Sequence, residues 1–166
     1  MTGALNTLRQ SAVELLREYG LYAVTAMESD SRKRWDGPVA AVSLSRVVCA
    51  AGGFRDYLGS RKNPDTGDVD ELYGKGVELT LSLDLYAPRH SGESACQEAA
   101  GIMAEALTCR GIGGLSVREM QTGAVEFLER DCLYRMPVSC TCKGWLVAVA
   151  DSSGAFVDFE VKGIRI

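Results

Sequence analysis

Three groups of side chains in this chain have the chemistry that catalysis or metal binding requires. The first is the triplet Asp65, Thr66 and Gly67, which matches the motif of the carboxylates that share a proton in aspartic proteases. That motif needs an apolar strand on either side, whereas Asn63 and Pro64 precede this triplet. We therefore interpret it as a type I or type II turn.

The second group is a cluster of four carboxylates, which supply the oxygen ligands that calcium prefers. The cluster lacks the alternate spacing, the central glycine and the terminal glutamate of a helix-loop-helix calcium site. We expect a solvated acidic loop that binds no metal. Its members are Asp65, Asp68, Asp70 and Glu71.

The third group consists of cysteines and one histidine. Cys140 and Cys142 alternate on one predicted strand, so their side chains point the same way, roughly 6.5 Å apart along it. Two thiolates could share a metal ion at this spacing, but no CxxC pair accompanies them. His90 is the only histidine and follows Pro88, with no serine or cysteine in a recognised nucleophile motif. We predict no catalytic residue, no metal, no cofactor and no enzyme activity.

Composition indicates a globular protein of one domain, residues 1–166. The chain has 46% hydrophobic and 24% charged residues, ordinary values for a soluble protein, and its 166 residues can bury a substantial core. Its net charge of −4 gives no overall attraction to nucleic acid. The start MTGALNTLRQ has no signal-peptide pattern, so we expect a cytoplasmic protein whose six cysteines are reduced.

The strand predicted over 77–86 decides the fold class. Its sequence, VELTLSLDLY, alternates aliphatic and polar residues without a break, which is typical of a strand with one buried and one solvated face. Helical periodicity follows from Ser94 to about Cys109, and an earlier apolar stripe predicts a first helix that ends at Gly20. We predict an α+β fold, with a mainly antiparallel sheet and two principal helices packed on one face.

Further strands are predicted on both sides of this centre. Residues 21–27 and 39–50 are rich in β-forming residues and should pair as a hairpin. Residues 133–149 should pair with 156–166 as a closing hairpin. The glycine-rich and charged segment 52–76 is expected to be a long, poorly packed loop that can move.

Charged clusters provide the candidate interface. Arginine and tryptophan are frequent at binding hot spots, although a charged hairpin tip whose tryptophan packs back on the sheet explains the larger cluster equally well. In the functional interpretation, basic residues of one subunit contact Asp65, Asp68, Asp70 and Glu71 of a neighbour. The basic residues are Arg32, Lys33, Arg34, Arg61 and Lys62, with Trp35 beside the first three.

The order of the elements resembles a known family. With the strand VELTLSLDLY followed by the helix SACQEAAGIMAEAL, the chain resembles the tail terminator proteins of long-tailed bacteriophages, including those of Gram-positive prophages and phage-tail-like particles. The resemblance covers about 5–149 and rests on element order and length, with no catalytic motif to transfer. It implies a small α+β protein that forms a hexameric ring. Residues 151–166 would then be an added C-terminal strand.

The resemblance implies a structural function. The ring would cap the tail tube, stop its polymerisation and join it to the head or neck. Its partners would be copies of itself, the tube protein and a neck or connector protein, in a tail assembled in the bacterial cytoplasm without a membrane. Two alternatives stay open, namely another neck or tail-completion protein of the same particle, and a small cytoplasmic enzyme or ligand-binding domain.

The polar side of the 77–86 strand is the candidate lumen surface of such a ring. No other predicted element covers this side. Glu78 and Asp84 are acidic, and negative charge would let DNA pass through the lumen as cargo without binding. We therefore expect these two carboxylates to face the lumen.

Overall fold

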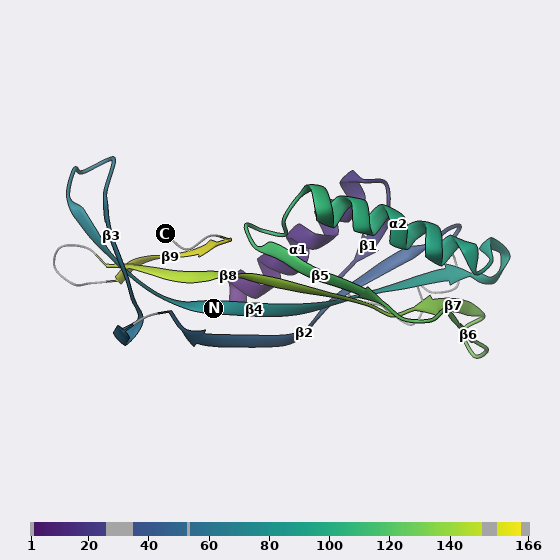
Figure 1. The fold of residues 1–166 in the computed structure, drawn as a ribbon. Helices are drawn as coiled ribbons and strands as arrows, with labels where there is room; N and C mark the ends of the chain where they lie inside the picture. The colour runs from purple at the N-terminus through teal and green to yellow at the C-terminus, as the bar shows by residue number, and fades with distance from the viewer. Residues whose placement is uncertain (1, 26–34, 53, 151–155, 164–166) are drawn as a thin grey trace.

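The computed structural model describes residues 2–25, 35–52, 54–150 and 156–163, with side chains except at 2–4 and 156–159. Within this part of the chain, two helices lie on one face of a nine-stranded, mainly antiparallel sheet (Figure 1), which confirms the predicted α+β class. The helices are α1 Thr2–Glu18 and α2 Ser94–Cys109, with short 3-10 turns at η2 Phe54–Asp56 and η3 Arg89–Ser91. The strands are β1 Tyr22–Val24, β2 Val39–Ala51, β3 Tyr57–Lys62, β4 Val69–Pro88, β5 Ser116–Thr122, β6 Glu126–Leu128, β7 Leu133–Met136, β8 Val138–Ala150 and β9 Phe156–Lys162.

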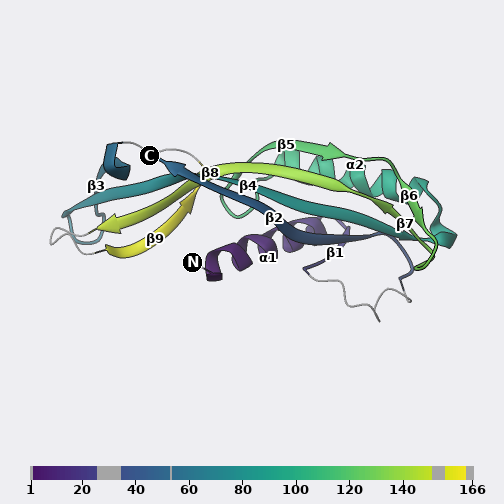
Figure 2. The same cartoon turned by 90° about the horizontal axis from the view of Figure 1, so that it is seen from below.

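Strand β4 runs the length of the sheet, and the other strands are built on it directly or through a neighbour. Its 20 residues span about 65 Å at the usual rise of a strand. The registers place β2 and β3 along one edge of β4, and β8 and β7 along the other. Strands β5 and β9 extend the sheet beyond β8. The result is a long, twisted sheet that reaches well past the helices at one end (Figure 2).

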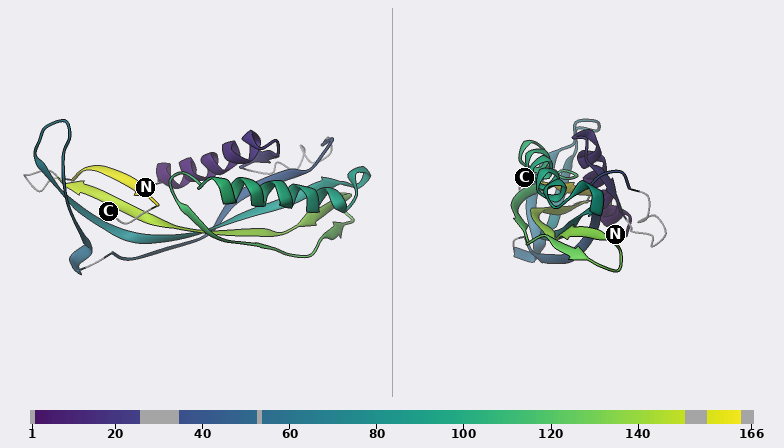
Figure 3. Two further views of the ribbon diagram at one scale, coloured as in Figure 1. Left: turned by 45° about the horizontal axis from the view of Figure 1, so that its top comes forward. Right: turned by 90° about the vertical axis from the view of Figure 1, so that its right-hand side faces the viewer.

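The helices cover the half of the sheet that contains most of the predicted 77–86 strand (Figure 3). There the odd-numbered residues Leu79, Leu81, Leu83 and Leu85 are at most 1% exposed, as the alternation predicts. They form one core with both helices and with β8. The partners in this core include Leu16, Ala99, Met103, Ala106, Cys140 and Cys142.

Beyond the helices, the buried side of β4 changes to the opposite face. Even-numbered Leu72 and Gly74 are buried in this half, whereas Tyr73 and Lys75 are not. Leu72 packs with Val147 and Val149 in a second, smaller cluster, which Leu58 and Trp145 border. We call this helix-free part of the sheet the arm; it consists of β3, residues 69–76 of β4, residues 145–150 of β8, and β9.

Gly74 is needed for the close packing of the arm. A Cβ atom at this position would lie 2.5 Å from the Leu146 carbonyl oxygen and 2.8 Å from a methyl group of Leu58. Gly59 allows a bulge in β3, where its φ of 136° accompanies a shift in the register with β4. Both glycines therefore lie within strands, Gly74 at a close contact and Gly59 at a bulge.

The prediction of a long loop over 52–76 is wrong. This segment holds η2, β3, a tight turn at 63–68 and the first part of β4. Its glycines and charges were interpreted as loop signals, but Gly74 lies at a crowded contact and Arg61 and Asp70 form an ion pair inside the arm. A narrow sheet with few buried aliphatic residues has a composition close to that of a loop.

Two strand predictions need correction and one is confirmed. β1 pairs with β2 in parallel, so 21–27 and 39–50 form no hairpin. The 133–149 strand is interrupted at Pro137, which has no N–H to continue the ladder. The segment 125–132, whose sequence fits either a helical turn or a short strand, contains β6. β8 and β9 pair as the predicted closing hairpin, although its turn at 151–155 lies outside the described residues.

The change of face can be tested with Leu72. Leu72→Ala should lower the free energy of unfolding by about 2–4 kcal/mol, because it removes a fully buried side chain. Val69→Ala is the matched control, since Val69 lies on the same strand but is 52% exposed, and it should lower this free energy by less than about 1 kcal/mol. Equilibrium urea unfolding measures both, and equally small effects would contradict a packed arm.

Candidate functional site

The buried cysteines are part of the main core. The Sγ atoms of Cys140 and Cys142 lie 3.7 Å apart, and both residues are fully buried under the helices. The hydrogen bond that Cys140 shares with Cys142 and burial raise the pKa of the Cys140 thiol, and burial likewise raises that of Cys96. A protonated thiol is a poor nucleophile and a poor metal ligand. No group of three or more candidate metal ligands occurs among the described residues.

The other candidates for chemistry lie in exposed turns. His90 is exposed in η3. Asp65 and Thr66 donate their backbone N–H groups to the Asn63 side-chain oxygen at 2.9 and 3.4 Å, which confirms that the protease-like triplet is a turn. Within the part of the chain that the structure describes, no helix is both long and apolar enough to cross a membrane.

The larger basic cluster is only partly described. Arg32, Lys33 and Arg34 lie outside the described residues. Trp35 is half-buried beside Tyr86, with ring centroids 6.4 Å apart. This is the placement expected for a tryptophan that packs back on the sheet.

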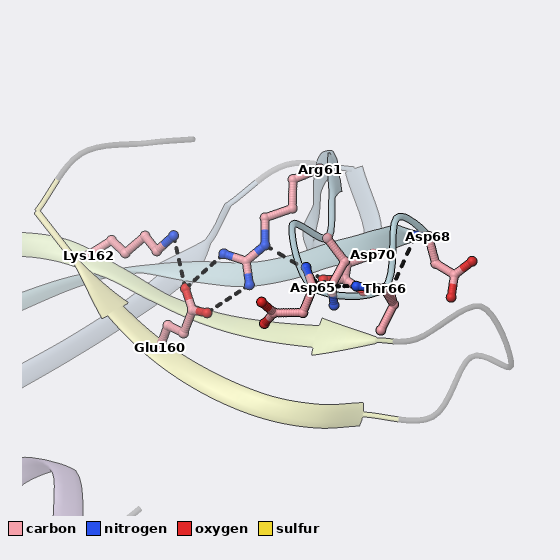
Figure 4. Close-up of polar contacts among 8 residues, drawn as sticks. Arg61, Asp65, Thr66, Asp68, Asp70, Glu160 and Lys162 are labelled. Carbon is pink, nitrogen blue, oxygen red and sulfur yellow. Dashed lines mark hydrogen bonds and ion pairs between the residues drawn. The ribbon is translucent and has the colours of Figure 1, made fainter.

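Two predicted interface residues form an ion-pair network inside the arm instead (Figure 4). Arg61 donates two hydrogen bonds to Glu160, at 2.8 and 3.2 Å, and its Nε lies 3.7 Å from a carboxylate oxygen of Asp70. Lys162 pairs with Glu160 at 2.9 Å. Asp70 is only 6% exposed and both Arg61 and Asp70 bind within their own chain, while their role in an interface stays a prediction.

This network joins the two edges of the arm. β3 and β9 lie on opposite sides of β4 and β8, and the registers put Arg61, Asp70 and Glu160 on the same face as Leu72 and its neighbours. The sheet must therefore curl so that Arg61 reaches Glu160 above the small apolar cluster. Hydrogen bonds from Arg61 and then from Lys162 lower the pKa of Glu160 to about 2.

The remaining predicted interface residues lie in or next to the turn at 63–68. Asp65, Asp68 and Lys62 are exposed, and none has an ion pair among the described residues. Glu71 is half-buried on β4 and raises the pKa of Tyr57 by accepting its hydrogen bond.

The two candidate lumen carboxylates are each paired with a cation of the same chain. Glu78 lies 3.0 Å from Lys143, and Asp84 lies 2.7 Å from Arg135. Asp84 also accepts hydrogen bonds from the Ser82 hydroxyl and the Val138 N–H. These cations offset the negative charge that the sequence suggested for this face, and the lumen role stays a prediction.

The same polar face has a groove that sequence reasoning missed. We call it the basic groove. Arg46 and Arg118 are exposed and have no ion pair among the described residues. Its only sequence signal was a lone arginine in each of two otherwise strand-like segments. The groove is lined by Arg46, Val48, Ala50, Gly76, Val77, Glu78, Arg118, Lys143, Gly144, Trp145 and Gly163.

Apolar surface is exposed where the helix layer ends. A hollow of about 50 Å³ opens beside the start of α1, between Leu5, Leu8, Val47, Cys49 and other apolar residues. Phe54, in η2, is 85% exposed. Sequence reasoning assigned η2 to a loop and had no reason to single out either feature.

Comparison with known proteins gives little further information. No protein-family model matches the chain, and no curated protein matches it. Among solved structures, a chain from the virion of a native gene transfer agent particle is similar over 86% of this chain and 92% of its own length, with 11% sequence identity and a TM-score of 0.34. A TM-score of 0.34 is too low to indicate a common fold.

The Arg61–Glu160 pair predicts a pH-dependent stability. Because the pKa of Glu160 is lower in the folded chain than its ordinary value of 4.5, its contribution is present above pH 5 and is lost as the pH falls towards 2. Glu160→Gln should therefore lower the free energy of unfolding by roughly 1–2 kcal/mol at pH 6 and by much less near pH 2.5.

Urea unfolding at the two pH values measures this difference. Glu98→Gln, on the exposed side of α2, is the control and should change the free energy of unfolding by less than about 0.5 kcal/mol at either pH. An effect of Glu160→Gln that is the same at both pH values would contradict a charged pair in the arm.

Proposed function

We propose that this chain is a structural subunit of a phage-like particle, a tail terminator that forms a ring on the tail tube. The ring stops the tube from polymerising and joins it to the head or neck. The strand VELTLSLDLY followed by the helix SACQEAAGIMAEAL, which form part of β4 and most of α2, carries the resemblance to tail terminators that supports this proposal. The family assignment and the ring are our inference from the sequence and the arm together.

The observation that carries the proposal is the arm. It extends far from the helix-covered core (Figure 1), and only three of its hydrophobic residues are fully enclosed in their own cluster among the described residues. Phe54, Tyr57 and Val69 are at least 42% exposed at this end. A protruding arm with a small core of its own offers a surface that a second protein can cover.

A subunit of this shape can act by steric means alone. The arm and the helix-covered body are different surfaces, so contacts between the arm of one copy and the body of the next are head-to-tail and can close into a ring. A ring on the tube end covers the surface that the next tube subunit needs. Its other side is free to bind a neck or connector protein, while DNA passes through the centre.

Self-assembly is the first test of this proposal. At high concentration, the purified protein should sediment as an oligomer and show rings in negative stain. Adding it to polymerising tube protein should shorten the tubes, because capped ends stop growing. A protein that stays monomeric and leaves tube length unchanged would contradict the proposal.

The enzyme alternative has its own test. We propose that no catalytic group is needed, so His90→Ala, Cys109→Ser and Cys132→Ser should each leave ring formation and tube capping unchanged. All three side chains are exposed, so these variants should fold. Loss of capping in any variant that still forms rings would support a chemical role for that side chain.

The neck alternative is separated by the partner that the protein binds. A terminator binds the last ring of the tube, whereas a neck protein of another kind binds the connector and leaves free tubes uncapped. Co-sedimentation with preformed tubes and with isolated connector distinguishes the two. Binding to the connector alone would favour the alternative.

A further inference from the structure

The basic groove has the shape and charge to hold a small acidic segment. It contains three cations, Arg46, Arg118 and Lys143, and one carboxylate, Glu78, which pairs with Lys143. Gly76 lies opposite Trp145 in the β4–β8 register and has no side chain to fill the space beside the indole ring. Two arginines are therefore left to bind an anion at an open site.

The turn at 63–68 presents such a segment. We call it the acidic turn. Asn63 holds it through backbone and side-chain hydrogen bonds, and the Thr66 hydroxyl accepts a hydrogen bond from the Asp68 N–H at 3.3 Å. Asp68 points away from the Arg61–Glu160 pair (Figure 4). Asp65 and Asp68 thus lie on a hydrogen-bonded turn at the tip of the arm. The exposed cation that is nearest to them in sequence is Lys62.

The acidic turn cannot reach the basic groove of its own chain. The turn ends where β4 begins at Val69, and the groove includes Glu78, nine residues further along the same strand. That separation is roughly 30 Å, far more than an arginine side chain spans. A contact between these two surfaces must therefore join two molecules.

We propose that the acidic turn of one copy docks in the basic groove of the next copy, with Asp65 and Asp68 facing Arg46 and Arg118. This contact rests on the proposed function, because it is a head-to-tail contact within the ring. It replaces the pairing of Arg61 and Lys62 with the acidic cluster, since Arg61 and Asp70 bind within one chain.

A second copy fits the basic groove better than nucleic acid does. The chain carries a net charge of −4, so a long polyanion is repelled as it approaches. The short acidic turn has two carboxylates, one for each of the two arginines that have no ion pair among the described residues. It needs no basic surface outside the groove. The contact lies between exposed charges, so it should weaken as salt rises.

Charge reversal tests the contact from both sides. Arg46→Glu with Arg118→Glu, or Asp65→Lys with Asp68→Lys, should weaken assembly at least about tenfold at low salt, because like charges then face each other. Combining all four substitutions in one chain should restore assembly. An equimolar mixture of the two double variants should also assemble, with the two kinds of chain alternating around the ring.

Sedimentation velocity of the full chain measures assembly, or co-sedimentation with tubes if rings form only there. Lys62→Glu is the matched control. It reverses one charge on the same hairpin, in the direction opposite to Asp65→Lys and Asp68→Lys, and so adds negative charge beside the acidic turn; assembly should be unchanged or stronger. Circular dichroism checks that each variant is folded, as expected for exposed positions.

The outcomes separate this inference from the proposed function. Wild-type rings that both double variants also form would overturn the docking contact and leave the ring proposal standing. Wild-type protein that neither self-associates nor caps tubes would overturn the ring itself. A groove variant that assembles normally but loses affinity for a labelled DNA duplex would show that the groove binds a polyanion, which also overturns the docking contact.

Discussion

Side chains of a strand alternate between two faces, so a strand that is buried on one face contributes either its odd-numbered or its even-numbered residues to a core. β4 contributes both sets, the odd-numbered leucines to the core under the helices and even-numbered residues to the small cluster of the arm. The buried side of β4 changes from one face to the other across Lys75–Glu78, where no side chain is fully buried. The body and the arm thus have separate cores on opposite faces of one continuous ladder.

This continuity decides how the arm is held. β2 and β8 both pair with β4 over the residues where its buried face changes, so the pairing continues from the body into the arm. No linker separates the two parts, so the arm is a stiff extension of the body and its tip lies at a defined distance. A partner bound at the tip would therefore be held in a defined position relative to the body.

Ion pairs within the chain distinguish some of its carboxylates from others. Asp70, Glu78 and Asp84 each pair with a cation of their own chain. Asp65 and Asp68 lie in the same run of acidic residues as Asp70, but they are exposed and lack ion pairs among the described residues. Proximity in sequence therefore does not indicate which carboxylates are available.

The sequence predicted the body well and the arm poorly, for a physical reason. In the body, the leucine alternation of 77–86 and the apolar stripe of α2 each face a thick core, so periodicity is clear. In the arm, Gly74 and Arg61 stand where a thicker core would have large aliphatic residues. The small cluster has little room, and an ion pair joins its edges. The parallel pairing of β1 and the groove around Arg46 depend on register between distant segments, which no local pattern encodes.

The Arg61–Glu160 pair also bears on the timing of folding. Its two residues are 99 positions apart in the sequence. Contacts between such distant residues form late, because a long loop must close first. The helix-covered core can therefore form while the arm is still open at one edge, so we expect the arm to close after the body has folded.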